Sequence, residues 1–147
     1  MSLISFLTEI AMAKKGELKS LGKTTQHVYK GADASLLEIV PNPSKEHNVR
    51  LEVTIEGEEF TCVCPVTGGP DYGAITIIYT PQDSLVESKS LKLYLESFRQ
   101  EGIFHEKVVS KICEDLGQLL RPVNLRVQGK FKPRGGWAIY PVAQYRR

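Results

Sequence analysis

The spacing of the apolar residues changes twice along this chain, and no other feature constrains the fold as much. Residues 47–57 alternate apolar and polar side chains, which predicts a half-buried strand, and the β-branched run at residues 74–80 predicts a buried strand. Apolar residues then recur every three or four positions through residues 84–102 and 104–120, which predicts two helices. Alternation returns at residues 123–131, so a third strand follows the helices.

Two shorter segments complete the predicted pattern, a strand at residues 35–40 and a last strand at residues 137–140. Strands joined by short turns pair antiparallel. We therefore predict an α+β fold, an antiparallel β-β-α-α-β-β sheet with two helices on one face. Residues 1–20 are expected to form a flexible or loosely docked arm, and residues 21–147 a single domain. Joining copies edge to edge into a barrel would protect the open sheet edges.

The composition restricts the class of protein. A chain of 147 residues with 41% hydrophobic and 24% charged residues is typical of a globular domain, and a net charge of +2 does not by itself indicate nucleic-acid binding. Three cysteines without disulfide-framework spacing indicate reduced thiols in the cytoplasm. The N-terminal apolar run lacks a basic region in front of it and is interrupted by Glu9, so we expect neither secretion nor a membrane span.

The segment FTCVCPVTGGPDYG, residues 60–73, holds two of the three cysteines and an acid beyond a Pro/Gly-rich turn. A thiol is a good nucleophile only as the thiolate, which requires a nearby group that lowers its pKa or takes its proton. Asp71, folded back by the turn, could serve Cys64 in this way. A small buried cysteine and a turn aspartate are the alternative.

A zinc site is a further alternative for the same segment, with Cys62, Cys64 and His105 as ligands. We expect the two sulfur atoms to face opposite sides of the strand, with at most one in a pocket. The chain has no C-x-x-C or H-x-x-x-H pair to complete such a site, so we predict no metal. Cys113 falls on the apolar side of the second helix and is expected in the core.

Basic residues gather at the start of the first helix. Lys89 and Lys92 are three positions apart and share a helix face, where a bound phosphate would relieve their conflict with the helix dipole. A solvated lysine face is the alternative. Arg134, beside two glycines that permit close backbone approach, is a third basic candidate.

The second helix begins with His105 and Glu106. A glutamate can accept two parallel N–H bonds from a guanine-like edge, and the histidine could donate to a ring or to a leaving group. A first-turn glutamate that favours the helix dipole, beside an exposed histidine, is the alternative.

Taken together, FTCVCPVTGGPDYG, VESKSLKLYLESFR, GIFHE and GKFKPRGG closely resemble the short bacterial form of the queuosine-pathway nitrile reductases, the QueF family. The resemblance covers roughly residues 35 to 140, and ESKSLKLY fits the family signature E-(S/L)-K-(S/A)-x-K-(L)-(Y/F/W) at every position. It implies reduction of 7-cyano-7-deazaguanine to 7-aminomethyl-7-deazaguanine with two NADPH. It also implies the tunnelling fold (T-fold) and a homo-oligomer, commonly two stacked pentamers with sites between subunits and no direct contact with nucleic acid.

The resemblance also implies roles for individual residues. Cys64 resembles the nucleophile that adds to the nitrile to give a thioimide. The other implied residues are the acid/base partner Asp71 with His105 nearby, the substrate-binding Glu106, Glu87 and Ser88, and the NADPH-binding Lys89, Lys92 and Arg134. No G-x-G-x-x-G follows a strand, so NADPH binding would not be of the Rossmann type. Cys62 has no implied role.

Three rival functions remain at this point. An archaeal branch that resembles the family uses a similar Cys and Asp to make an amidine on tRNA, but it lacks the ESKSLK-type signature. A zinc-dependent cyclohydrolase shares the fold, and its ligand set is not evident in this chain. A non-catalytic purine- or RNA-binding module would leave Cys64 and Asp71 without a role.

Overall fold

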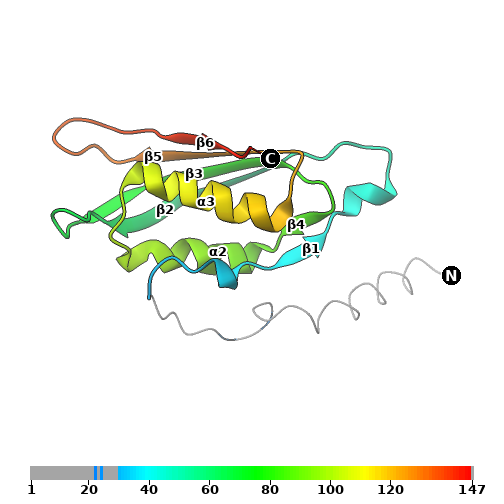
Figure 1. The fold of residues 1–147 in the computed structure, drawn as a ribbon, viewed down its shortest axis with the longest axis horizontal. Coiled ribbons are helices and arrows are strands. Elements are labelled where there is room, and N and C mark those ends of the chain that lie inside the picture. The colour runs from blue at the N-terminus through cyan, green and yellow to red at the C-terminus, as the bar shows by residue number, and fades with distance from the viewer. Residues whose placement is uncertain (1–21, 23, 25–29, 147) are drawn as a thin grey trace.

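The computed structural model describes residues 22, 24 and 30–146, so the predicted arm at residues 1–20 lies outside the described residues. The strands are β1 (Ile39–Pro41), β2 (Val53–Val63), β3 (Pro70–Thr80), β4 (Ser84–Val86), β5 (Asn124–Phe131) and β6 (Val142–Gln144) (Figure 1). The helices are α2 (Ser88–Glu96) and α3 (His105–Leu120), with short 3-10 helices η1 (Ala34–Leu36), η2 (Pro43–Glu46) and η3 (Ser97–Gln100).

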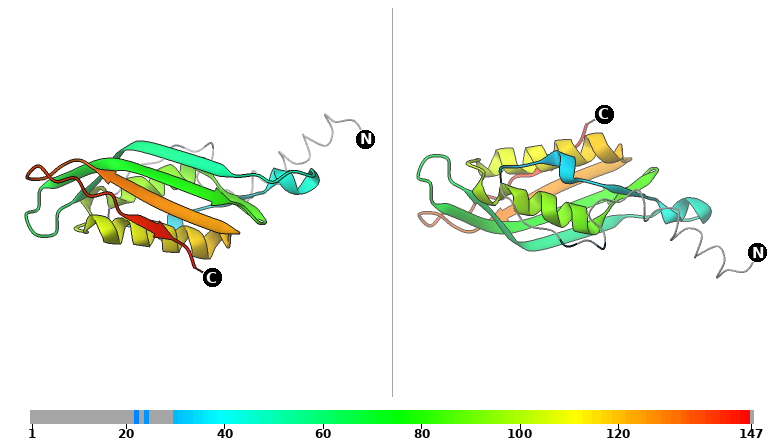
Figure 2. Two further views of the ribbon diagram at one scale, coloured as in Figure 1. Left: turned by 90° about the horizontal axis from the view of Figure 1, so that it is seen from above. Right: turned by 90° about the horizontal axis from the view of Figure 1, so that it is seen from below.

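The main sheet has four antiparallel strands in the order β2-β3-β5-β6, and β1 and β4 form a separate antiparallel pair. Figure 2 shows α2 and α3 together on one face of the main sheet. The predicted α+β class, with antiparallel pairing and two helices, is therefore confirmed. Since β2 and β6 each have one strand neighbour among the described residues, they form the two edges of the sheet.

The core lies between the main sheet and the two helices. Alternate residues of β3 and β5 point into it, as the period-2 pattern predicts, and α3 contributes the stripe at every third or fourth position. The buried apolar side chains of these three elements are Ile75, Ile77, Tyr79, Leu125, Val127, Phe131, Val108, Val109, Ile112, Leu116 and Leu120. Cys113 is also buried among them, as expected. The open face of the sheet therefore carries the intervening, more polar positions.

The strands around the cysteine segment extend further into it than predicted. β2 continues to Val63, and β3 already begins at Pro70. Only the residues between them form the turn, because the two strands pair in register up to Val63 and Pro70. Asp71 consequently lies in a strand, opposite Cys62, and not in the turn.

Four predicted boundaries are wrong, in each case because strand pairing overrides the local pattern. Residues 47–52 are not a strand, since β2 has its first partner at Val53. Residues 35–40 contain a 3-10 turn, and the strand there begins only at Ile39. The start of the predicted first helix, Ser84–Val86, is instead strand β4 paired with β1. The last strand is Val142–Gln144, beyond residues 137–140.

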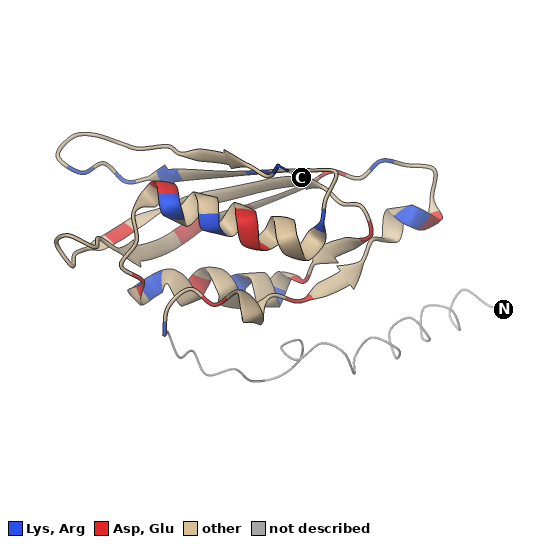
Figure 3. Ribbon diagram, viewed as in Figure 1, with Lys and Arg blue, Asp and Glu red and all other residues tan. Residues whose placement is uncertain are grey.

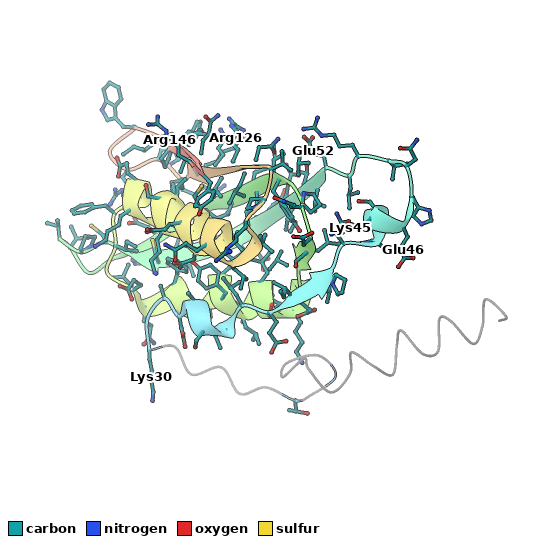
Figure 4. The ribbon with its side chains drawn as sticks, turned by 45° about the vertical axis from the view of Figure 1, so that its right-hand side comes forward. Lys30, Lys45, Glu46, Glu52, Arg126 and Arg146 are labelled. Atoms are coloured by element: carbon teal, nitrogen blue, oxygen red, sulfur yellow. The ribbon has the colours of Figure 1, made fainter. Side chains whose placement is uncertain are left out.

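Charged residues of both signs are distributed along the two helices (Figure 3). Arg126 and Arg146 lie on the side of the sheet away from the helices (Figure 4), and Arg126 pairs in register with Gln144 of β6. Within the described part of the chain, no helix is both long enough and apolar enough to cross a membrane.

Candidate active site

Cys64 directly follows β2 and opens the turn that leads to β3. Its backbone N–H donates to the Gly69 carbonyl at 2.8 Å, and its carbonyl accepts from the Gly68 N–H at 2.9 Å. Gly68 has φ +71°, a conformation that favours glycine, so the sequence T-G-G suits this turn. The residue is 6% exposed, which places the thiol at the edge of the core.

Cys62 and Cys64 share one side of the strand, so the prediction that they face opposite sides is wrong. Side chains two positions apart in a strand point the same way. Phe60, Cys62 and Cys64 are all buried, whereas Thr61 and Val63 between them are only half-buried. The two thiols are therefore neighbours on the core side, and strand geometry does not separate their roles.

The end of β2 is joined to the connection between the two helices. Val63 donates its N–H to the Glu101 carbonyl at 2.9 Å and accepts from the Ile103 N–H at 3.0 Å. This parallel pairing places the first residue of α3, His105, next to the cysteine end of the sheet. Helix α3 is thus positioned by backbone hydrogen bonds as well as by its apolar stripe.

Asp71 faces two nitrogen groups with one oxygen. Its Oδ2 lies 3.2 Å from Nε2 of His105 and 3.3 Å from Nη1 of Arg134. The Asp71 side chain is only 6% exposed. A buried carboxylate is expected to be paired. The strand register and the 132–138 hairpin together bring these three residues to one place.

His105 is held by the stacking of its ring and lies within ion-pair distance of Asp71. The imidazole is 2% exposed and stacks flat on Phe131, with ring centres 3.8 Å apart and planes 2° apart. Although Nε2 is close to Asp71, the alignment does not meet hydrogen-bond geometry, so within the described residues neither ring nitrogen has a hydrogen-bond partner. Burial, and then the charge of Arg134, lower the pKa of His105, against the opposite effects of Asp71 and Glu106. A neutral imidazole can donate from one nitrogen and accept at the other.

Arg134 sits at the tip of a tight hairpin. It exchanges two backbone hydrogen bonds with Trp137, at 2.9 and 3.0 Å, and the intervening Gly135 and Gly136 both have positive φ, as a type I′ turn requires. The hairpin directs the half-exposed guanidinium to Asp71. The structure therefore places Arg134 at the cysteine end of the sheet. Lys89 and Lys92, predicted to bind NADPH together with Arg134, lie elsewhere, in α2.

The thiols of Cys62 and Cys64 differ in pKa. Hydrogen bonds from the Thr67 hydroxyl, then from the backbone N–H groups of Thr67 and Val66, lower the pKa of Cys64 to about 7, and Arg134 adds a smaller effect in the same direction. Burial, then the charge of Asp71, raise the pKa of Cys62 to about 12. Of the two, Cys64 is the one that supplies a thiolate at neutral pH.

The start of α2 is occupied by a side chain of the protein itself. Glu87 is the N-cap, and its carboxylate accepts from the N–H groups of Lys89 at 2.9 Å and Ser90 at 2.7 Å. The helix therefore begins at Ser88, and Glu87 fills the place suggested for a phosphate. A cofactor phosphate at this end would depend on the lysine ammonium groups instead.

One chain does not bring all the predicted residues together. Cys64, Asp71, His105 and Arg134 lie at one end of the molecule, and Glu106 follows His105 as an exposed residue of α3. The start of α2 lies at the other end of α2 from the cysteine segment (Figure 1). The predicted residues at this start are Glu87, Ser88, Lys89 and Lys92. The nine residues of α2 alone span about 13 Å.

A cleft of about 580 Å³ runs between α2 and β2. Its apolar floor includes Phe60, Leu91 and Leu95, and Lys92 and Arg99 lie on its helix side. An apolar floor with cations at the rim suits a planar ring carrying phosphates, so these residues fit part of a dinucleotide. Glutamates of β2 line the opposite side, and they are Glu56, Glu58 and Glu59. The helix side carries Glu96 as well, 3.9 Å from Lys92.

Sequence reasoning missed several residues around these two sites. Thr67 lies inside the quoted cysteine segment, and its hydroxyl next to a thiol was the available signal. Phe131 reads as an ordinary core residue of a strand, and Arg99 as an ordinary helix-end cation. Within the residues described, no three or more His, Cys, Asp or Glu side chains are grouped as a metal site requires.

Comparisons with known proteins identify the family of this chain. A family model described as QueF-like protein matches residues 70–147. The NADPH-dependent 7-cyano-7-deazaguanine reductase of Helicobacter pylori (strain Shi470) is 50% identical over 129 residues, covering 88% of this chain and 86% of the relative. The protein of the same name from Bacteroides thetaiotaomicron is 45% identical over 135 residues, covering 90% and 86%.

A solved structure extends the likeness to the fold. The apo form of an archaeosine synthase, QueF-Like, superposes with a TM-score of 0.57 at 20% identity, covering 67% of this chain and 94% of that one. At that identity the likeness concerns the fold alone. On the family match and the curated relatives, the chain belongs to the QueF family, which includes NADPH-dependent 7-cyano-7-deazaguanine reductases.

Proposed function

We propose that this protein is an NADPH-dependent oxidoreductase that reduces the nitrile of 7-cyano-7-deazaguanine to the primary amine of 7-aminomethyl-7-deazaguanine, in tRNA queuosine biosynthesis. Relatives that carry the name of this activity are 45–50% identical over about nine-tenths of the chain. The observation that carries the proposal is the low-pKa thiol of Cys64 at the same end of the sheet as the buried Asp71 and His105 and the half-exposed Arg134.

Covalent capture is the first step of the proposed mechanism. The Cys64 thiolate adds its electron pair to the nitrile carbon, and the carbon–nitrogen triple bond becomes a double bond with the charge on nitrogen. A proton delivered through Asp71 to that nitrogen completes a neutral thioimide. His105, stacked on Phe131, would orient the deazaguanine, and Glu106 would accept N–H bonds from its guanine-like edge.

Reduction then follows in two stages. Bound NADPH supplies hydride to the carbon, twice in each catalytic cycle. After the first hydride, Cys64 leaves with the electron pair of the carbon–sulfur bond and an imine remains; after the second, the amine is complete. Four electrons and four protons are added in all, of which each hydride carries two electrons and one proton. Lys89 and Lys92 are the proposed phosphate ligands, and Arg134 is a further candidate. Lys92 and Arg99 both line the cleft.

We further propose that sites form between subunits of a T-fold homo-oligomer in the cytoplasm, with two stacked pentamers as the expected assembly. The separation of the Cys64 end from the Lys89 end of α2 supports this, because a neighbouring copy could bring its own lysines to the cysteine. The exposed edges β2 and β6 are available for such contacts. A monomer in sedimentation at assay concentration would argue against composite sites.

The experiment that tests the activity mixes purified protein, the nitrile and NADPH, and follows loss of the reduced cofactor's absorbance. We expect two NADPH oxidised for each amine formed, with the amine identified by mass. The amidine-forming chemistry of the archaeal branch would consume no NADPH, so the same assay separates the two. A folded protein that oxidises no NADPH above background contradicts the proposal.

A further inference from the structure

The hairpin between β5 and β6 projects into solvent at the cysteine end of the sheet. Residues 132–140 are exposed, and the hairpin extends past the helices at the same end as the turn between β2 and β3 (Figure 1). A Cβ atom added at Gly135 or Gly136 would meet no described atom within 4 Å, so the tip has room to move. The contacts of its side chains therefore decide where the tip lies.

The Arg134 side chain joins this tip to Asp71. The hydrogen bond runs from Nη1 of the guanidinium to Oδ2 of the carboxylate at 3.3 Å. Charged donors usually approach a carboxylate oxygen to about 2.8 Å, and arginine binds most strongly through two parallel N–H groups. The Nε2 atom of His105 lies 3.2 Å from the same oxygen. The bond from Arg134 is therefore long and shares its acceptor with a second group.

The two partners are exposed to different degrees. The Asp71 side chain is 6% exposed, whereas the Arg134 side chain is 43% exposed. An anion arriving from solvent thus reaches the guanidinium without entering the core. A phosphate group can accept two parallel N–H bonds from an arginine, and such a pair is stronger than one long bond. Arg134 is therefore a cation that an incoming phosphate can take from Asp71.

We propose that Asp71 and a phosphate group of the cofactor compete for Arg134. In the free protein the guanidinium is held on Asp71; when the cofactor binds, the guanidinium turns to the phosphate and leaves Asp71 with His105. Arg134 is then a positioning residue whose partner depends on whether the cofactor is bound. The inference rests on the proposed function for the identity of the ligand, a dinucleotide that carries phosphates. Because coupling between two partners is reciprocal, weakening the hold of Asp71 on Arg134 should strengthen cofactor binding.

The test is a double-mutant cycle on the binding of NADP⁺, with no nitrile present. Calorimetric titration gives the Kd of wild type, Asp71→Asn, Arg134→Gln and the double variant. We expect Asp71→Asn to bind about fivefold more tightly than wild type, and Arg134→Gln about fivefold more weakly. In the Arg134→Gln background, Asp71→Asn should change Kd by no more than about twofold, because the object of the competition is gone. Asp83→Asn, which removes a surface carboxylate paired with Lys45, is the control and should leave Kd unchanged.

The result has a specific sign that a structural role of Asp71 would not produce. Damage to the site by Asp71→Asn would weaken binding, and weaker or equal binding in this variant overturns the proposal. If Asp71→Asn tightens binding equally with and without Arg134, the carboxylate acts only by repelling the anion, and the competition is rejected as well.

A second measurement uses wild type and does not depend on the folding of an Asp71 variant. Trp137 is the one tryptophan of the chain and exchanges two backbone hydrogen bonds with Arg134, so its fluorescence reports on the hairpin. Saturating NADP⁺ should shift the emission of wild type and leave that of Arg134→Gln as it is. Unchanged wild-type emission at saturation rejects the release of Arg134.

The outcomes separate this proposal from the proposed function. If the cycle and the emission behave as expected but wild type reduces no nitrile, the competition stands and the proposed reaction fails. If wild type reduces the nitrile but Asp71→Asn binds NADP⁺ no more tightly, only the competition fails. A wild-type protein that binds no NADP⁺ rejects both.

Discussion

The guanidinium of Arg134 lies 3.3 Å from the carboxylate of Asp71, although 63 positions separate them in the chain. The same oxygen, Oδ2, is 3.2 Å from Nε2 of His105. One buried carboxylate thus faces a fixed cation and a titratable ring. The charge state of His105 is therefore tied to both partners, and this relationship can be measured.

Stability should depend on pH through His105. Burial and Arg134 lower its pKa in the folded state, whereas the unfolded chain keeps the ordinary value of 6.5. The unfolded state then binds more protons just below pH 6.5, so the free energy of unfolding falls as pH drops through that window. Thermal denaturation from pH 5 to pH 8 should show a steeper loss in wild type than in His105→Gln. Parallel curves for the two proteins would exclude this linkage.

The nitrile adduct should form on Cys64 and not on Cys62. Cys64→Ala should abolish the mass adduct and the near-ultraviolet absorbance of the thioimide, since it removes the thiol whose pKa is about 7. Cys62→Ala should retain both at neutral pH. It should lower the free energy of unfolding by about 1 kcal/mol, because it removes a buried sulfur. An adduct that persists in Cys64→Ala would reassign the nucleophile.

Asp71→Asn should slow the reaction without preventing substrate binding. The amide cannot deliver a proton to the nitrile nitrogen, so we expect kcat to fall by roughly 10²- to 10⁴-fold. The measurement is NADPH oxidation under saturating nitrile. Asp83→Asn is the matched control, since it loses a surface ion pair with Lys45 and should keep full activity. A kcat within twofold of wild type would remove Asp71 from the mechanism.

Lys89→Ala combined with Lys92→Ala should raise the apparent KM for NADPH by about tenfold or more, since each lost phosphate contact is worth roughly 1 kcal/mol. Adduct formation with the nitrile alone should survive, because the cysteine end of the molecule is unchanged. Lys107→Ala on exposed α3 is the control and should leave KM as it is. An unchanged KM in the double variant would refute the assignment.

The same variant also tests the composite site. Mixed and reassembled with Cys64→Ala protein, it should regain part of the wild-type activity, because some interfaces then pair an intact cysteine with an intact lysine pair. Neither variant alone should gain activity on the same treatment. If the mixture stays at the summed activity of its parts, the two ends of α2 do not meet across an interface.

Glu87→Ala should destabilise the protein. Both carboxylate oxygens of Glu87 accept N–H groups of the first turn of α2, and loss of a helix N-cap costs about 1 kcal/mol. Chemical denaturation of Glu87→Ala and the exposed control Glu114→Ala provides the comparison. Equal unfolding midpoints would show that Glu87 is not needed as a cap and would favour its predicted role in substrate binding.

The sequence predicts the parts of the fold that depend on short-range patterns. The buried run at 74–80 and the stripe of α3 are visible because burial itself sets the period of their apolar residues. Ser84–Val86 is misread as helix, because only its pairing with Ile39–Pro41, more than 40 residues earlier, makes it a strand. Trp137 belongs to apolar residues expected in a strand, yet it is 80% exposed in the Arg134 hairpin.

The candidate site, like the fold, is predictable from the sequence only in part. The family prediction, made from four motifs, is confirmed by the match to residues 70–147 and by the curated relatives. The contact between Asp71 and Arg134 could not be predicted from the sequence, since it depends on β3 and β5 being neighbours in the sheet. Thr67 was overlooked because a hydroxyl three positions from a thiol becomes a donor only once the turn has folded.

The edge strand β2 has a consequence for symmetry. It carries the exposed glutamates Glu56, Glu58 and Glu59 and a register shift between Gly57 and Phe60, whereas the opposite edge, β6, is followed by the basic Arg146 (Figure 4). A twofold dimer that joined β2 to β2 would place like charges against one another. Pairing β2 of one copy with β6 of the next would avoid that repulsion. Each copy would then use one edge for the copy before it and the other edge for the copy after it. A heterologous contact of this kind would give a ring if its rotation closes and an open filament if it does not, in place of an isologous pair.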